Sequence, residues 1–217
     1  MSNRTAAVIG LGQFGFELAK SLALAGLEVI AIDNDETKVR DIAEFVAFAV
    51  QTDASDPKSM AEAGVAEADL GIVAIGEMEP NILAVMVLKE LGLGEILAKA
   101  ITPMHGQILR QLGASKVIEP EREIAQRLAK QLAHPNVLEF VELSDEFSLA
   151  EVPALEWMVG KTLVEMNLRS KFGVSVIGIR RHADPHGLVL NPLAGDKIEA
   201  KDALVLLGRE KDITKLV

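Results

Sequence analysis

The feature that most constrains the fold is an alternation of short apolar runs with longer helical patterns over the first 120 residues. Runs that are apolar through nearly their whole length are typical of strands buried on both faces of a parallel sheet. Four of the five helical patterns between them end at or near a glycine. This alternation implies right-handed crossovers and predicts an α/β domain with a Rossmann-like, doubly wound parallel sheet. The expected strands are 6–10, 28–32, 46–50, 70–75, 95–100 and 115–120, and the expected helices are 14–26, 35–45, 56–64, 80–92 and 103–113.

After Pro120 the pattern changes to one amphipathic helix and then to a second set of strands. Ile124, Leu128 and Leu132 recur every four residues on one face of that helix, and a Pro-Asn pair at 135–136 ends it. Five strand-like runs follow, with one helical candidate among them, which predicts a small α+β unit. The expected domains are therefore 1–135, a Rossmann-like lobe whose crossover helix covers about 120–133, and 136–217, a small C-terminal α+β lobe.

Charge and composition narrow the classes of partner. The formal net charge of −10 disfavours nucleic acid and anionic lipid, because both repel an acidic surface. The absence of cysteine excludes disulfides, thiolate metal sites and cysteine nucleophiles. The N-terminus leads almost directly into a strand, and no apolar run reaches the roughly 18 residues of a membrane span. We expect a soluble cytoplasmic protein.

A glycine-rich turn marks the expected ligand site. Gly10, Gly12 and Gly15 form G-x-G-x-x-G between a strand and a helix, enclosing Leu11, Gln13 and Phe14. In this pattern the first glycine makes the tight turn, the second lets phosphate approach the backbone, and the third allows close helix–strand packing. The helix N-terminus offers free N–H groups to an anion.

Asp33 ends the second expected strand, at the spacing at which a carboxylate accepts hydrogen bonds from ribose hydroxyls. Such a carboxylate repels a 2′-phosphate, and the neighbouring Asn34 and Asp35 add no positive charge. The sequence therefore favours an adenine nucleotide or NAD over NADP.

The ends of the next strands add further candidates. Asp53, followed by Ala54, lies where it would accept from the exocyclic amine of adenine; alternatively it is a loop residue before a helix that Ser55 or Asp56 caps. The remaining candidates follow the fourth and fifth strands and share the same crevice by topology: Ile75, Gly76, Glu77 and Lys99. Lys99 either reaches phosphate or is a solvated strand end.

Catalytic groups are scarce, although an NAD-dependent oxidoreductase remains the alternative function. A hydride transfer needs a group that exchanges a proton with the substrate. The chain has no tyrosine, which removes the Tyr-Lys pair of short-chain dehydrogenases. His105, at the start of a helix, and the loop residues His134, His182 and His186 lie in no pattern that pairs them with an acid, and loop histidines are mostly solvated.

Taken together, the chain resembles the RCK family, regulators of potassium conductance, and in particular the cytosolic Ktr-type subunits of bacterial potassium uptake. The resemblance spans nearly the whole chain, in the segments VIGLGQFG, AIDNDETKV, IVAIGE, LAKA, LGASKVIEPERE, VLEFVELSDEFSLAEV and NLRSKFGVSVIGIRR. It implies a non-enzymatic, nucleotide-sensing subunit that forms a homo-oligomeric ring, typically octameric. The ring lies beneath a membrane-embedded potassium channel subunit, binds ATP or ADP, and in some members binds NAD or NADH.

The resemblance also implies roles for single residues. By motif match Glu121 helps to hold a divalent cation, Mg²⁺ or Ca²⁺, near the phosphates across the dimer; otherwise it is a first-turn glutamate favoured by the helix dipole. Gln13 replaces the arginine of the family motif, which predicts weaker discrimination between ATP and ADP.

The C-terminal lobe resembles the part of the family that binds cyclic di-AMP at a dimer interface in some members, and plain dimer packing is the alternative. The positions that match that site approximately are Arg169, Ile177, Ile179, His182 and Pro192.

Overall fold

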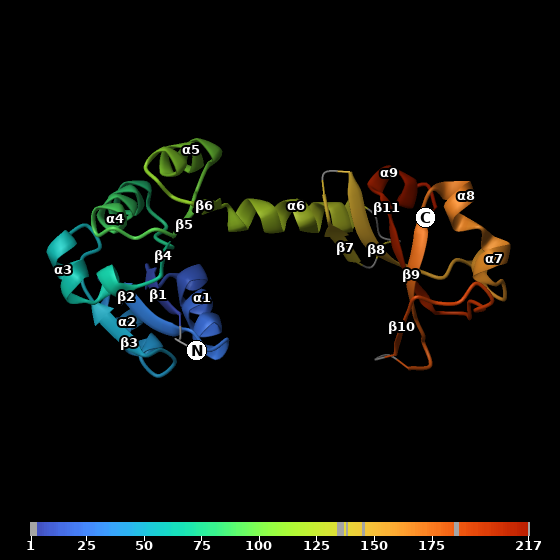
Figure 1. Ribbon diagram of the computed structural model, residues 1–217, viewed down its shortest axis with the longest axis horizontal. Coiled ribbons are helices and arrows are strands. Elements are labelled where there is room, and N and C mark those ends of the chain that lie inside the picture. The colour runs from blue at the N-terminus through green and yellow to red at the C-terminus, as the bar shows by residue number, and fades with distance from the viewer. Residues whose placement is uncertain (1–3, 134–136, 138, 145, 185–186, 217) are drawn as a thin grey trace. The chain divides into compact units, whose positions relative to one another are not determined.

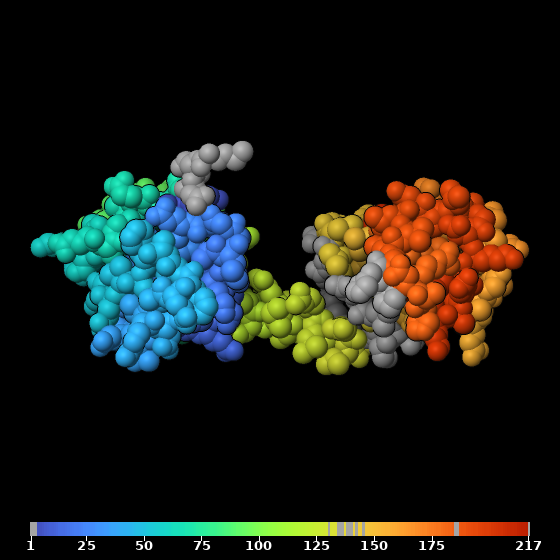
Figure 2. Space-filling view, turned by 90° about the horizontal axis from the view of Figure 1, so that it is seen from below, coloured from blue at the N-terminus to red at the C-terminus, as the bar shows by residue number. Residues whose placement is uncertain are grey.

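The computed structural model describes residues 4–133, 137, 139–144, 146–184 and 187–216. The chain divides into two compact units, unit 1 over Met1–Arg122 and unit 2 over Glu123–Val217. This division falls inside the helix that joins the units, whereas the boundary expected at residues 135 and 136 lies outside the described residues. Each unit is closely packed by itself (Figure 2). Within the described residues, no helix combines the length and apolar character needed to cross a membrane.

Unit 1 is the expected doubly wound domain, a parallel sheet with the strand order β3-β2-β1-β4-β5-β6 (Figure 1). All six expected strands are confirmed, as β1 (Thr5–Ile9), β2 (Glu28–Asp33), β3 (Phe48–Gln51), β4 (Leu70–Val73), β5 (Ile96–Lys99) and β6 (Lys116–Ile118). The intervening helices are α1 (Gln13–Leu24), α2 (Glu36–Ile42), α3 (Pro57–Glu62), the 3-10 helix η1 (Val65–Glu67), α4 (Met78–Glu90) and α5 (Pro103–Gln111).

The sheet of unit 1 is covered on both faces, which explains why its inner strands are apolar except at their ends. Along β1, Ala7 and Ile9 pack into one core cluster with residues of α3, α4 and α5, while Val8 packs into another with residues of α1 and α2. β3 is the exception. It is an edge strand whose Phe48 is 54% exposed, so its apolar run does not mark a strand buried on both faces, as the sequence had led us to expect.

The helix α6 (Pro120–Ala133) connects the two units and is confirmed as one helix. Ile124, Leu128 and Leu132 on it are 52%, 50% and 72% exposed. Their four-residue spacing therefore places them in one apolar stripe along α6. Among the residues that the structure describes, none covers this stripe.

Unit 2 is the expected small α+β unit, built on a five-stranded sheet with the order β10-β9-β11-β8-β7. Its strands are β7 (Glu139–Glu142), β8 (Phe147–Pro153), β9 (Ser175–Arg180), β10 (Leu188–Leu190) and β11 (Ala203–Arg209), and all its pairings are antiparallel. Its core packs one face of this sheet against the short helices, and includes Val152, Met166, Ile179 and Leu204.

The helices of unit 2 correct the sequence-based expectation. The single helix expected over 163–172 is two short helices, α7 (Leu163–Met166) and α8 (Leu168–Phe172), because Asn167 between them adopts a left-handed conformation with φ 47°. Sequence reasoning also missed the 3-10 helix η2 (Glu156–Met158) and α9 (Glu210–Ile213). Pieces this short carry too little periodicity to be recognised.

Candidate nucleotide-binding site

The glycine-rich turn has the geometry that each of its glycines was expected to provide. Gly10 has φ +93°, and a Cβ there would lie 2.8 Å from the backbone nitrogen of Ile75. A Cβ on Gly15 would lie 1.9 Å from the carbonyl oxygen of Gly10, so helix α1 packs against the turn too closely for any side chain. Around Gly12, by contrast, an added Cβ would meet nothing within 4 Å. The two outer glycines are thus needed for packing, and the middle one leaves open space at the N-cap of α1.

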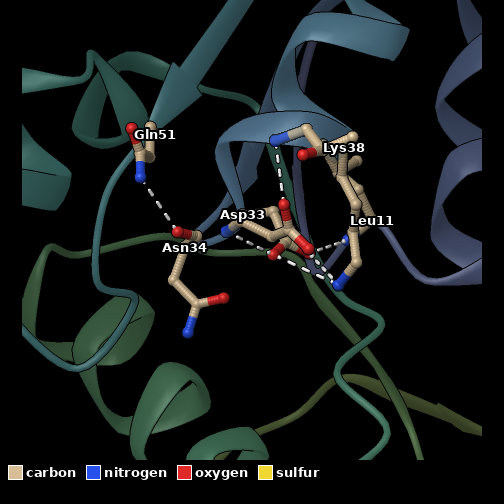
Figure 3. A network of polar contacts seen from close by, with 7 residues as sticks. Leu11, Asp33, Asn34, Lys38 and Gln51 are labelled. Carbon is tan, nitrogen blue, oxygen red and sulfur yellow. Dashed lines mark hydrogen bonds and ion pairs between the residues drawn. The ribbon is translucent and has the colours of Figure 1, made fainter.

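Asp33, at the carboxyl end of β2, is held by three groups of its own unit (Figure 3). Its carboxylate accepts hydrogen bonds from the Leu11 N–H at 2.7 Å and from the Asp35 N–H at 2.9 Å. The Lys38 ammonium lies 3.4 and 3.3 Å from its two oxygens. Asp33 is 8% exposed. The carboxylate is therefore fixed beside the glycine turn.

A cleft of about 450 Å³ opens at the carboxyl ends of β1, β2 and β4, where the strand order reverses. Ligands of open α/β sheets bind at this position. Nine of the residues proposed from the sequence line it: Gly10, Gly12, Asp33, Asn34, Asp53, Ala54, Ile75, Gly76 and Glu77. Leu11, Gln13, Phe14 and Gly15 belong to the adjoining turn and first helical residues but do not line the cleft.

Sequence reasoning missed several residues of the cleft wall: Lys38, Thr52, Ser55, Glu79, Pro80 and Leu83. Lys38 follows Asp33 by five residues, from inside α2. The sequence pattern predicts where α2 starts, but it does not show that the Lys38 side chain contacts Asp33 at the end of β2.

Asp53 lines the cleft and also orders its own loop. One of its carboxylate oxygens accepts from the Ser55 N–H at 2.9 Å and the Ser55 hydroxyl at 2.8 Å, and these bonds lower the pKa of Asp53. Asp56, not Ser55, caps α3 through the Ser59 N–H. Its pKa is lowered by hydrogen bonds from the side chain and backbone of Ser59. The alternatives for Asp53 are compatible, because a loop carboxylate with one engaged oxygen still presents acceptor capacity to a ligand.

Lys99 and Glu121 lie outside this cleft and contact each other. Lys99, at the end of β5, places its ammonium 2.5 Å from Glu121 Oε1 in the first turn of α6. The same ammonium lies 5.6 Å from the centre of the Phe14 ring. The hydrogen bond from Lys99 lowers the pKa of Glu121. Lys99 is thus neither a cleft-lining residue nor a solvated strand end; its side chain is 13% exposed.

Two buried polar side chains form hydrogen bonds with the backbone at or just after the carboxyl ends of β4 and β5. Asn81, fully buried on α4, donates from Nδ2 to the carbonyls of Ile75 at 2.8 Å and Lys99 at 3.2 Å. His105, in the first turn of α5 as expected, is fully buried, and its Nδ1 accepts from the Ile101 N–H at 3.3 Å. Burial lowers the pKa of His105, which favours the neutral ring. This environment suits a structural histidine.

The five positions matched to a cyclic di-AMP site do not share one environment in unit 2. Arg169 lines a surface cleft of about 390 Å³ between α7, α8 and β9, but the other four do not line that cleft. Ile179 is fully buried in the core, while Ile177 and Pro192 are half-buried. The His182 N–H donates to Asp202 Oδ1 at 3.1 Å. Binding of a cyclic dinucleotide here stays a prediction.

A doubly wound sheet with a cleft over its switch point, followed by a separate small α+β unit, defines a two-domain protein with a nucleotide-binding fold. Residues 6–120 match the TrkA-N domain and residues 148–217 match the TrkA-C domain. The chain is 38% identical to Ktr system potassium uptake protein C of Bacillus subtilis, over 96% of this chain and 94% of that one. It is 31% identical to Ktr system potassium uptake protein A of Vibrio alginolyticus, over 93% and 91%. The chain therefore belongs to the family of Ktr and Trk potassium uptake proteins.

Solved structures share this architecture. The GsuK channel superposes with a TM-score of 0.66 at 21% identity, over the whole of this chain and 39% of the channel chain. GsuK bound to ADP superposes with a TM-score of 0.54 at 25% identity, over 61% of this chain and 34% of that chain. The chain thus spans less than half of each of these solved chains, and the likeness concerns the fold.

Proposed function

We propose that the chain is a non-enzymatic regulatory subunit of a bacterial potassium uptake system, and that an adenine nucleotide binds in the cleft of unit 1. The observation that carries the nucleotide site is the open space at Gly12, at the N-cap of α1 and beside Asp33. The names of the Ktr relatives support the transport role. The related GsuK structures were solved with NAD and with ADP, which supports the choice of ligand.

The phosphates of the ligand would be held by backbone N–H groups rather than by cationic side chains. The first intrahelical bond of α1 runs from the Phe16 N–H to the Gly12 carbonyl. The N–H groups of Gln13, Phe14 and Gly15 are therefore orphans of the first turn, which is where helices bind phosphate. The Asp33 carboxylate would accept from the ribose hydroxyls.

Charge in the cleft bears on which nucleotide is preferred. The cleft is lined by four acidic residues, Asp33, Asp53, Glu77 and Glu79. Lys38 is the only cation among the lining residues, and it is paired with Asp33. A triphosphate carries more negative charge than a diphosphate or NAD, so these acidic side chains repel ATP more strongly than ADP or NAD. Together with the neutral Gln13, this supports a reduced preference for ATP over ADP.

A divalent cation held by Glu121 across a dimer stays a prediction, because one chain would supply only part of such a site. Among the described residues, no group of three or more His, Asp or Glu side chains is arranged for a metal ion. Glu121 already contacts the Lys99 ammonium.

The non-enzymatic assignment rests on what surrounds the cleft. The sequence has no tyrosine, and His105, the histidine of residues 1–122, does not line the cleft. The oxidoreductase alternative gains no support from the Ktr relatives.

The proposal extends to assembly and location. The exposed stripe of Ile124, Leu128 and Leu132 on α6 supports self-association through this helix. The resemblance to Ktr-type subunits supports an octameric ring, docked in the cytoplasm on a membrane-embedded potassium channel subunit. The acidic charge disfavours nucleic acid as a partner.

The nucleotide site is tested by a matched pair of glycine substitutions. Both Gly12→Ala and Gly94→Ala add a methyl group that meets nothing within 4 Å, at positions without a left-handed φ, so both variants should fold. Only Gly12 lines the cleft. We expect calorimetry with ADP, ATP and NADH to show about tenfold or greater loss of affinity in Gly12→Ala and unchanged affinity in Gly94→Ala. Equal affinities in both variants would place the ligand elsewhere, and hydride exchange with a substrate would reopen the oxidoreductase reading.

A further inference from the structure

Lys99 connects two parts of unit 1 that are far apart in sequence. Its ammonium contacts the Phe14 ring, next to the orphan N–H groups of α1, and the Glu121 carboxylate in the first turn of α6. The glycine turn and the helix that leads into unit 2 therefore meet at one side chain.

The position of Lys99 is fixed more firmly than that of an ordinary surface lysine. Its side chain is 13% exposed, and it follows the fully buried Ala98 on β5. The Lys99 carbonyl accepts from the buried Asn81 side chain, which also holds the Ile75 carbonyl on the cleft wall. Glu121 is the exposed end of the pair, with 70% of its side chain open to solvent.

We infer that Lys99 is a positioning residue that couples ligand occupancy of the glycine turn to the start of α6. The inference rests on the proposed nucleotide site. A phosphate bound at the orphan N–H groups of Gln13 and Phe14 brings negative charge to the side of the turn that Lys99 already contacts. That charge competes with Glu121 for the ammonium. The first turn of α6 then loses part of the ion pair that holds it to β5, and the helix opens more readily.

The strength of the competition depends on the number of phosphate charges. A triphosphate attracts the ammonium more strongly than a diphosphate, so ATP should release Glu121 further than ADP does at equal occupancy. Lys99 acts through Phe14 and Glu121 and does not line the cleft. Because this coupling is reciprocal, Lys99 also influences affinity, and measurement at saturating nucleotide separates the effect on α6 from the effect on binding.

The test is amide hydrogen exchange on the full chain, read over residues 124–128, whose N–H groups are bonded within α6. Each protein is measured without ligand and at a nucleotide concentration that calorimetry shows to be saturating for that protein. In the unaltered chain, nucleotide should speed exchange by about two- to fivefold, the range that a partly exposed ion pair is worth. In Lys99→Met this response should vanish, and in Glu121→Gln, which removes the pair from its exposed end, it should vanish as well.

Lys20→Met is the matched control, because Lys20 also contacts a phenylalanine ring, that of Phe45 at 4.3 Å, and forms no ion pair with a described residue of α6. It should keep the full response. A response that persists in both Lys99→Met and Glu121→Gln overturns the coupling. Failure of the unaltered chain to bind any nucleotide refutes the proposed function itself, and calorimetry reveals that outcome before any exchange is measured.

Discussion

The two sheets of the molecule are built on opposite plans. β1 in unit 1 is buried at four of its five positions, and helices cover both faces of its sheet. β8 in unit 2 alternates strictly between buried and half-exposed side chains after its first residue. One face of the unit 2 sheet forms the core, and the other carries the Arg180–Glu151 pair, joined by hydrogen bonds of 2.6 and 2.8 Å.

This difference shows which surface of each unit is available to bind a ligand or a partner. A sheet covered on both faces can present functional groups only at its strand ends, which is where the cleft of unit 1 lies. A sheet with one open face can also bind through that face. Substitutions should therefore act on the two units separately, and four predictions test this, from the largest expected effect to the smallest.

The largest effect is expected in unit 1 from Gly15→Ala. The new Cβ would lie 1.9 Å from the Gly10 carbonyl oxygen, a backbone atom that cannot move without displacing the turn. We expect a loss of more than about 3 kcal/mol in the unfolding free energy of unit 1. Denaturant unfolding should show unit 2 unchanged, with Gly94→Ala as the control. Equal destabilisation of both units would mean that they unfold as one.

The counterpart in unit 2 is Asp202→Asn. Asp202 is 1% exposed and accepts from Arg181 Nη1 at 2.8 Å, the His182 N–H at 3.1 Å and the Glu199 N–H at 3.0 Å. Removing the charge of Asp202 leaves the Arg181 guanidinium without an ionised partner. We expect this to lower the unfolding free energy of unit 2 by about 3 kcal/mol. Nucleotide affinity, measured by calorimetry, should not change; a parallel loss of affinity would contradict the independence of the units.

Acid should destabilise the two units in different pH windows. Burial lowers the pKa of His105 below its ordinary 6.5, so the unfolded chain binds a proton first and unit 1 loses stability as pH falls below 6.5. Burial raises the pKa of Asp202, but hydrogen bonds from Glu199, His182 and Arg181 outweigh it and bring the pKa below 3.8. The Asp202 contribution is therefore present above pH 3.8 and is lost only as pH falls through its lowered folded-state pKa.

The measurement is denaturant unfolding between pH 7 and 5. Unit 1 should lose at most about 1.4 kcal/mol per pH unit through His105. His105→Gln should flatten this slope without changing unit 2. A slope that survives the substitution would assign the effect to another group.

The smallest effect is expected from Gln13→Arg on the exposed first residue of α1. A guanidinium near a bound terminal phosphate should raise the ATP-to-ADP affinity ratio by about fivefold. Calorimetry with both nucleotides measures the ratio, and Gln13→Met controls for the change in side-chain length. An unchanged ratio would mean that Gln13 does not account for the expected loss of ATP selectivity.

Much of the architecture followed from local pattern. All six strands of unit 1, its five α-helices and the connecting helix were predicted, because apolar runs and glycine stops record burial and chain reversal residue by residue. The glycine motif and Asp33 were placed for the same reason: a fixed spacing between a turn and a strand end depends only on local geometry. β3 was misjudged because an apolar run does not reveal whether a strand has a neighbour on each side.

The sequence by itself determined the class of fold, the family and nine residues of the cleft. Only the tertiary structure decided which groups of unit 1 contact one another in and around the cleft: Lys38 with Asp33, Asn81 with the ends of β4 and β5, and Lys99 with both Phe14 and Glu121. The Lys99 and Glu121 positions are 22 residues apart in the chain, and their contact depends on the parallel pairing of β5 with β6, which brings the start of α6 beside the end of β5. Periodicity records which face of an element is buried, but the partner of a charged side chain is set by the packing of whole elements.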